Sequence, residues 1–171
     1  MTVPDSVLVH ATAVALGRPI RGFGGTEGMG VLLLGESGSG KSDLALRLIA
    51  EGGCLISDDQ TLLSVRHDWL HARAPEAIKG LIELRGVGIV KLDPVAGAPI
   101  VLAVQLDASR AAPRLPEPAL YMPPAPLKPG RNPPIILLNP FEASATAKIS
   151  AAAAAAETGR FVAGVAPPES F

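Results

Sequence analysis

The sequence predicts one α/β domain with a largely β core and a helix near the C-terminus. Short apolar runs separated by glycines and polar turns recur along the chain, which is the pattern of strands buried in a sheet. A glycine-rich loop joins one such run, at 29–34, to an amphipathic helix predicted over 41–51. An alanine-rich segment with a proline at its start predicts a second helix over 140–156.

The remaining elements follow from the same signals. Apolar runs bounded by turn residues predict strands at 7–16, 29–34, 54–56, 61–66, 69–72, 100–106 and 135–138, and a strand pair around a glycine turn at 86–88 within 78–92. Residues 17–28 and 107–134 are predicted as loops, because glycine crowds the first and proline the second. We expect a single domain over 1–171, with its core at about 6–150 and a frayed tail at 157–171.

The composition excludes several classes of protein. Apolar residues make up 48% of the 171 residues and charged residues 18%, which is typical of a globular domain. Basic residues number 15 and acidic residues 16, so no basic field exists that would hold nucleic acid. A single cysteine, Cys54, excludes an intramolecular disulfide and a metal site built from several cysteines.

The mean hydropathy of +0.34 raises the question of a membrane. No run of about 18 uncharged apolar residues occurs, and the N-terminus lacks the basic segment and long apolar core of a signal peptide. We therefore expect a cytoplasmic protein that does not enter a membrane.

The loop after the 29–34 strand matches the phosphate-binding pattern G-x-x-x-x-G-K-[ST] at every position. Its members are Gly35, Glu36, Ser37, Gly38, Ser39, Gly40, Lys41 and Ser42. Backbone N–H groups of such a loop surround phosphates, and the glycines let the backbone approach them. Lys41 would reach the β- and γ-phosphates, and the hydroxyl of Ser42 would bind Mg²⁺. The motif predicts a site for the phosphates of a nucleoside triphosphate.

Two adjacent carboxylates, Asp58 and Asp59, follow the 54–56 strand, which we expect to lie next to the strand of the phosphate loop. Because neighbouring strand residues point in opposite directions, one carboxylate can face the metal while the other handles the proton of an acceptor hydroxyl. A solvated turn after a strand is the alternative interpretation. The position of the two aspartates at a strand end beside the phosphate loop favours the catalytic interpretation.

Other nucleotide-binding classes lack support. The chain has no L-S-G-G-Q-like signature of transporter ATPases and no N-K-x-D-like motif of GTPases. No arginine-rich lid segment of the nucleoside-monophosphate kinase type stands out either. A small-molecule kinase and a non-catalytic nucleotide-binding regulator stay as alternative hypotheses.

Further segments carry a resemblance to a known family. Residues 81–90, LIELRGVGIV, resemble the signature L-E-I-R-G-L-G-I of the bacterial HPr kinase/phosphorylase family. The phosphate loop continued as G-E-S-G-S-G-K-S-D, the pair at 58–59, the segment P-G-R-N at 129–132 and His10 in V-H-A occur in family order. The resemblance extends over about residues 6–150.

This resemblance implies a function and a fold. The family phosphorylates a serine of HPr, the phosphocarrier of the sugar phosphotransferase system, with ATP and Mg²⁺. In the reverse reaction inorganic phosphate attacks and pyrophosphate is released. The implied fold is similar to that of phosphoenolpyruvate carboxykinase, and the implied assembly is a homo-oligomer. The familiar form also has an N-terminal domain, so the chain resembles a compact form with only the C-terminal catalytic domain.

The resemblance also implies roles for single residues. Lys41 and Ser42 match the phosphate-binding lysine and the Mg²⁺ ligand, and Asp59 matches the base that accepts the serine proton. His10 would support this base. Asp58 and Glu83 would lie at the magnesium, and the signature loop would meet the partner through Glu83, Leu84, Arg85, Gly86, Val87 and Gly88.

Two arginines complete the implied set. Arg114 matches an arginine near the transferred phosphoryl group, and Arg131 belongs to the segment tied to dephosphorylation. Taken alone, His10 would be read as a hydrogen-bonded strand histidine and Arg85 as a surface charge. Four further polar residues on the predicted hairpin at 61–72 are expected to be solvated: Arg66, His67, His71 and Arg73.

Overall fold

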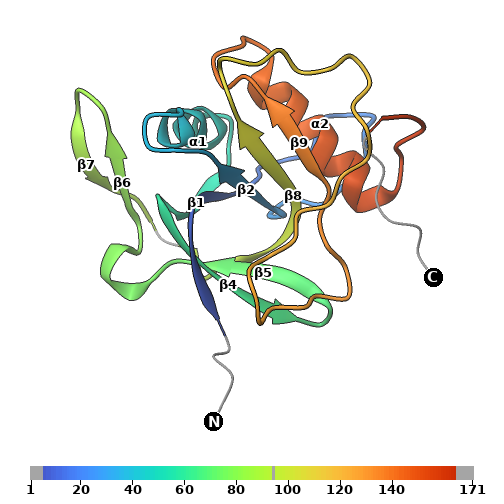
Figure 1. Cartoon of the computed structure of the whole chain (residues 1–171). Coiled ribbons are helices and arrows are strands. Elements are labelled where there is room, and N and C mark those ends of the chain that lie inside the picture. Colours follow the sequence, from blue (N-terminus) through green and yellow to red (C-terminus); the bar gives the residue numbers. More distant parts are fainter. Residues whose placement is uncertain (1–5, 94, 165–171) are drawn as a thin grey trace.

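The computed structural model describes residues 6–93 and 95–164, which form a mixed α/β domain with a sheet-rich core (Figure 1). Its strands are β1 (Val7–Ala15), β2 (Gly30–Leu34), β3 (Cys54–Ser57), β4 (Gln60–Arg66), β5 (Trp69–Arg73), β6 (Leu81–Leu84), β7 (Gly88–Lys91), β8 (Ala98–Leu106) and β9 (Ile135–Leu138). Its helices are α1 (Lys41–Ala50), α2 (Ala145–Thr158) and a short 3₁₀ turn, η1 (Glu76–Ile78). The predicted strands and the first helix are confirmed to within a few residues.

The main sheet closes on itself. Its strand order is β2-β1-β4-β5-β8-β9, β3 pairs with β1, and β2 also pairs with β8. The closure is possible because two long strands change partner along their length. The first half of β1 pairs with β4 and its second half with β2, while β8 begins against β5 and continues against β2.

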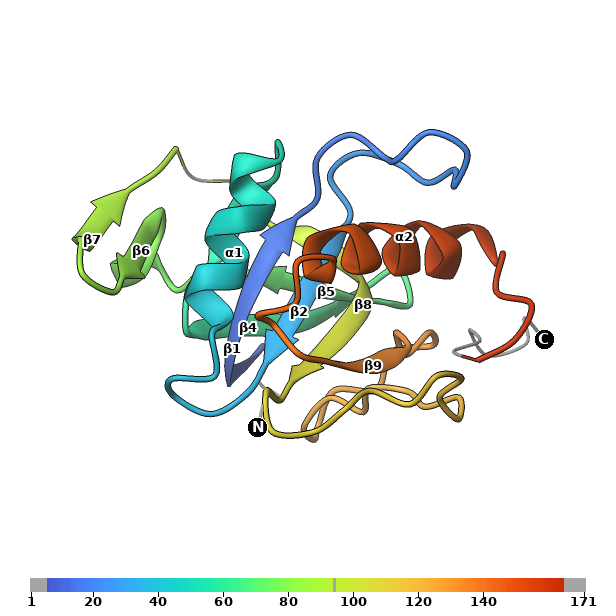
Figure 2. The same cartoon turned by 90° about the horizontal axis from the view of Figure 1, so that it is seen from above.

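This closure divides the core into two layers. On β2, Val31 and Leu33 face the helices and Leu32 faces the opposite layer, as the alternation of side chains along a strand requires. The first layer packs α1 and α2 against β1, β2 and β8, and Figure 2 shows both helices over that face. The second layer fills the space toward β4 and β5.

The prediction of a helix over 140–156 is wrong at both ends. The backbone N–H of Phe141 donates to Oδ1 of Asn139 at 3.0 Å, and this local bond holds the chain in turns until Ser144. α2 then runs to Thr158, within the segment expected to be frayed, and ends at Gly159 in a left-handed conformation with φ 67. Most of the remaining predicted tail, 165–171, lies outside the described residues.

The hairpin β6–β7 stands apart from the main sheet, beside α1 (Figure 1). Its strands pair antiparallel from Leu81 with Lys91 to Leu84 with Gly88. Ile82 anchors it, because this side chain is only 1% exposed and belongs to the core cluster of α1. In the part of the chain that the structure describes, no helix has the length and apolar character needed to cross a membrane.

Candidate functional site

The glycine-rich loop leads from β2 directly into α1. Gly38 and Gly40 have φ of 82 and 94, a left-handed region that favours glycine. At Gly35 an added Cβ would lie 2.8 Å from Cβ of Ser39, so this position has no room for a side chain. Around Gly38 no atom would lie within 4 Å of such a Cβ. The loop is therefore tightly folded at its base and open at its tip.

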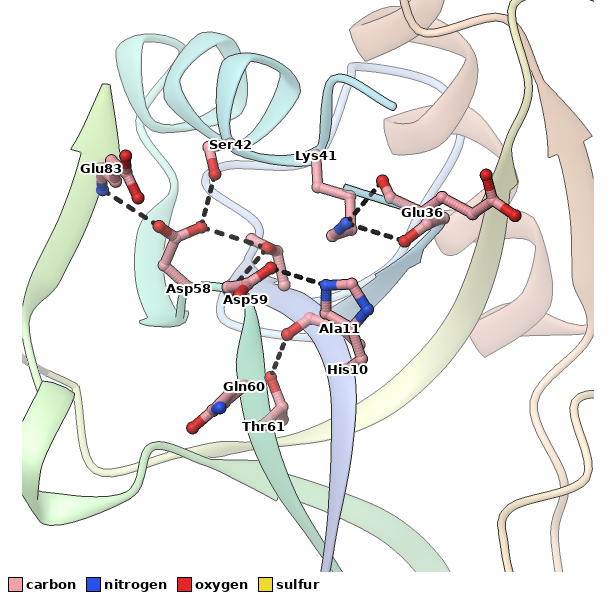
Figure 3. Close-up of polar contacts among 12 residues, drawn as sticks. His10, Ala11, Glu36, Lys41, Ser42, Asp58, Asp59, Gln60, Thr61 and Glu83 are labelled. Carbon is pink, nitrogen blue, oxygen red and sulfur yellow. Dashed lines mark hydrogen bonds and ion pairs between the residues drawn. The ribbon is translucent and has the colours of Figure 1, made fainter. Parts of the chain in front are cut away.

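Lys41 is the first residue of α1 and is only 5% exposed. Its Nζ donates to the backbone carbonyl oxygens of Gly35 at 2.7 Å and Glu36 at 3.0 Å. Burial lowers the pKa of Lys41, and the negative charges of Asp59 and Asp58 oppose this change. The ammonium group is thus held inside the loop, on the side where the two carboxylates lie (Figure 3).

The two carboxylates meet the loop because of the strand directions. β2 and β3 both run antiparallel to β1, so they are parallel to each other and end at the same edge of the sheet. The expectation that they are neighbours is wrong, because β1 lies between them. The crossover helix α1 spans this intervening strand, which therefore contributes its own residues, His10 among them, between the loop and the carboxylates.

Asp58 is the inner carboxylate, 8% exposed. Its Oδ1 accepts hydrogen bonds from Oγ of Ser42 at 2.7 Å and from Oγ1 of Thr12 at 3.2 Å. Its Oδ2 accepts one from the backbone N–H of Glu83 at 3.0 Å. One side chain thus joins the start of α1, the middle of β1 and the hairpin β6–β7.

Asp59 points away from Asp58, and it lies in the turn after β3 rather than in a strand. Its backbone has φ 65, and its Oδ1 accepts a hydrogen bond from Nε2 of His10 at 2.7 Å. The side chains are 59% exposed for Asp59 and 48% for His10, so both are open to solvent and to a bound molecule. Figure 3 shows Asp58 directed toward Ser42 and Glu83, and Asp59 toward His10.

The glycine-rich loop, Lys41, Ser42 and both aspartates line one cleft of about 530 Å³. One wall is the glycine-rich loop and the start of α1, the floor carries both aspartates, and the other wall is the β6–β7 hairpin. The lining residues are Ser37, Gly38, Gly40, Lys41, Ser42, Asp43, Leu46, Asp58, Asp59, Glu83, Leu84, Arg85, Val87 and Phe141. The cleft therefore joins phosphate-binding groups, carboxylates and an exposed hairpin.

Comparison with known proteins shows what the chain is similar to. Residues 25–106 match the family model of the HPr Serine kinase C-terminal domain. The HPr kinase/phosphorylase of Mycoplasmopsis pulmonis is 45% identical over 96 residues, which are 56% of this chain and 28% of that protein. That of Thermoanaerobacter sp. strain X514 is 48% identical over 71 residues, 41% of this chain and 23% of that protein.

A solved structure agrees over most of the fold. The HPr(Ser) kinase/phosphatase from Coxiella burnetii superposes with a TM-score of 0.63 at 27% identity, over 84% of this chain and 86% of that chain. This chain is therefore similar to the HPr serine kinase C-terminal domain over residues 25–106, and its fold is similar to that of the Coxiella structure. It matches only the C-terminal catalytic part, and the match spans 28% of the length of the Mycoplasmopsis relative.

Of the catalytic and metal-binding residues that the resemblance implies, the structure brings six together: His10, Lys41, Ser42, Asp58, Asp59 and Glu83. The backbone of Glu83 holds Asp58, and its carboxylate is exposed along the cleft. Two residues of the site escaped the sequence analysis. Thr12 carries no motif, and Phe141 was assigned to a helix although it lies at the cleft beside Gly40.

The two predicted arginines lie elsewhere. The backbone N–H of Arg131 donates to Asp68 O at 3.0 Å, and its guanidinium lies 5.3 Å from the centre of the Trp69 ring. Asp68 and Asp59 lie at opposite ends of β4, whose 7 residues put roughly 20 Å between them at about 3.3 Å per residue. Arg114 is exposed in the loop after β8. Neither arginine lines the cleft, and their roles stay predictions.

The side-chain oxygens at the start of α1 and on Asp58 suit a magnesium ion that also binds phosphates. Ser42 and Asp58 offer two oxygens of the kind that Mg²⁺ prefers, already directed at each other. Among the described residues, no group of three or more His, Cys, Asp or Glu side chains is arranged so that it could hold a metal ion. Mg²⁺ characteristically binds through one or two protein oxygens, with phosphates and waters completing its shell.

One expectation about the hairpin β4–β5 is corrected. Arg66 and His67 are exposed as predicted, but His71 is half-buried and its Nδ1 has no hydrogen-bond partner in the described chain. Burial lowers the pKa of His71, and the neighbouring charges of Arg66 and Arg73 act in the same direction. His71 lies on β5 and does not line the cleft.

Proposed function

We propose that this domain transfers the γ-phosphoryl group of Mg-ATP to a serine of HPr, and that it catalyses the reverse phosphorolysis, in which inorganic phosphate yields pyrophosphate. The observation that carries the proposal is the division of labour between the adjacent aspartates. Asp58 is bonded to Ser42 of the phosphate loop, whereas Asp59 is bonded to His10 and faces the open cleft. The names of the relatives supply the acceptor, HPr.

The glycine-rich loop binds the phosphates in this proposal. Backbone N–H groups at the open tip around Gly38 and at the start of α1 surround them, and the helix dipole favours their negative charge. Lys41 exchanges its bonds to the loop carbonyls for bonds to the phosphates. Ser42 and Asp58 would hold Mg²⁺, which neutralises charge on the phosphates when bound. A phosphate loop on a mostly β core also agrees with the phosphoenolpyruvate carboxykinase-like fold that the resemblance implies.

Asp59 acts as the base. It accepts the proton of the serine hydroxyl while the serine oxygen forms its bond to the γ-phosphorus and the bond from that phosphorus to the bridging oxygen of ADP breaks. His10 keeps the carboxylate oriented by its 2.7 Å hydrogen bond. In the reverse direction an oxygen of inorganic phosphate forms a bond to the phosphorus of phosphoserine, and the bond from that phosphorus to the serine oxygen breaks. The new P–O–P bond makes pyrophosphate, and the serine oxygen takes the proton that Asp59 carries.

The hairpin β6–β7 supplies the surface for the acceptor protein. Val87 and Ile89 are 73% and 72% exposed, and Val87 lines the cleft that holds Asp59. Apolar side chains this exposed at the edge of a cleft are typical of a docking surface. Arg85, also at the cleft, adds a positive charge to this surface.

Incubation of the domain with Mg-ATP and HPr tests the proposal. Intact-mass spectrometry is expected to show one phosphate per HPr on a serine, and phospho-HPr with inorganic phosphate is expected to yield pyrophosphate. The Lys41→Ala variant is expected to lose both reactions. Lys79→Ala is the matched control, because Lys79 lies outside the cleft and its Nζ lies 3.8 Å from the carboxylate of Glu76 on the same short turn. Nucleotide binding without any transfer to HPr would refute the kinase assignment and support the regulator.

A further inference from the structure

Thr12 links the two aspartates through a single hydroxyl. It lies on β1 opposite Leu33 and is completely buried. Its Oγ1 donates to Oδ1 of Asp58 at 3.2 Å and accepts a hydrogen bond from the backbone N–H of Asp59 at 3.0 Å. A hydroxyl has one proton to donate and two lone pairs, so it can make both bonds at once. No other described side chain bonds to both aspartates.

These bonds act at the point where the chain turns from β3 into β4. Asp59 has φ 65, and the N–H of Gln60 donates to the carbonyl oxygen of Asp58 at 2.7 Å, so the turn is tight. A left-handed aspartate is uncommon and persists when its surroundings hold it. The Oγ1 of Thr12 holds the backbone amide of Asp59 by accepting its hydrogen bond. The same Oγ1 donates to Asp58 and so fixes the inner carboxylate relative to that amide.

We propose that Thr12 is a positioning residue for the phosphoryl transfer, setting the direction of the Asp59 carboxylate relative to the phosphates. This inference rests on the proposed function, because it assigns the base to Asp59. Thr12 itself touches no substrate. Asp58 keeps its bonds from Ser42 and Glu83 without Thr12. Asp59, by contrast, loses the one bond that its backbone makes to a side chain of the described residues. Loss of the hydroxyl therefore affects the chemical step more than nucleotide binding.

The Thr12→Val variant tests this, since valine replaces the hydroxyl by a methyl group of similar size. We expect kcat for HPr phosphorylation to fall about 10- to 100-fold, as displaced catalytic groups do, with KM for Mg-ATP changed by less than about 3-fold. Thr12→Ser restores the hydroxyl and is expected to restore kcat. If Thr12→Val does not fold, Thr12→Ala removes the hydroxyl without adding a methyl group beside the carboxylate.

A second readout does not depend on catalysis. Amide hydrogen exchange measured by NMR is expected to be at least about 10-fold faster for Asp59 in Thr12→Val than in the wild type, because the amide loses its acceptor. In Thr12→Ser it stays slow. Unchanged exchange at Asp59 would overturn the inference even if activity falls.

Thr61 provides the matched control. It is also a completely buried threonine, and its Oγ1 donates to the carbonyl oxygen of Ala11 at 2.8 Å, but it contacts neither aspartate by a hydrogen bond. Thr61→Val is expected to lower stability and to retain kcat. An equal loss of kcat in Thr61→Val would reduce Thr12 to a structural residue. If the wild type does not phosphorylate HPr, the proposed function fails, and Asp59 exchange still decides whether Thr12 holds the turn.

Discussion

Replacing Asp59 by asparagine removes one proton acceptor from the cleft while leaving the backbone undisturbed. Asparagine tolerates the left-handed conformation at φ 65 as well as aspartate does. Its side-chain oxygen can still accept the hydrogen bond from Nε2 of His10. The amide cannot accept the proton of a serine hydroxyl, so the substitution tests the base and little else.

The expected size follows from the role and the surroundings of Asp59. A positioned general base contributes about 10²- to 10⁴-fold to the rate, which corresponds to roughly 2.7–5.4 kcal/mol of activation free energy. Binding of Mg-ATP is expected to stay the same or to tighten slightly. The charge of Asp59 opposes the lowering of the Lys41 pKa, so it lies within electrostatic reach of the phosphate site and repels the anionic nucleotide.

The assay separates kcat from KM for Mg-ATP, with phosphoserine on HPr measured by mass spectrometry. Asp68→Asn is the matched control, because Asp68 is an exposed aspartate with nearly the same backbone, φ 68, at the far end of β4. It is expected to keep the full rate. A kcat for Asp59→Asn within about 3-fold of the wild type would refute the assignment of the base.

Three further predictions concern the loop, the hairpin and the stability. Gly35→Ala places a Cβ 2.8 Å from Cβ of Ser39, so titration with a fluorescent ATP analogue should show at least about 10-fold weaker binding. Gly28→Ala is the control for backbone strain alone, because Gly28 also has a positive φ, 87, but an added Cβ there meets no atom within 4 Å, and it should bind the analogue normally. Val87→Asp should raise KM for HPr and leave KM for Mg-ATP unchanged, and Val162→Asp, at a residue 101% exposed, is its control. The pKa of His71 is lowered in the folded protein, so as the pH falls through 6.5 this histidine takes up a proton in the unfolded chain before it does so in the folded one. The free energy of unfolding therefore decreases as the pH falls through this window. Urea unfolding of His71→Gln should depend less on pH in this window than that of the wild type.

Much of the site is local in sequence and could be predicted from it. The loop from Gly35 to Ser42 lies between a buried strand and an amphipathic helix because its glycines adopt conformations that other residues avoid. The adjacency of Asp58 and Asp59 places both carboxylates at the end of β3, whereas their opposite directions depend on the turn that follows, where Asp59 has φ 65. The helix from 140 was mispredicted, because the bond from the Phe141 backbone to Asn139 competes with helix formation and leaves no signal in alanine content.

What the sequence by itself determined is the set of chemical groups and the local backbone that carries them, since motifs and periodicity act over a few residues. The tertiary structure alone decided which groups meet. β1 separates β2 from β3 and brings His10 to Asp59, 49 residues further along the chain. The same strand places Thr12 under both aspartates, and the fold keeps Arg131 at the far end of β4. Strand order depends on which apolar faces pack together across the whole domain, and no local pattern records that choice.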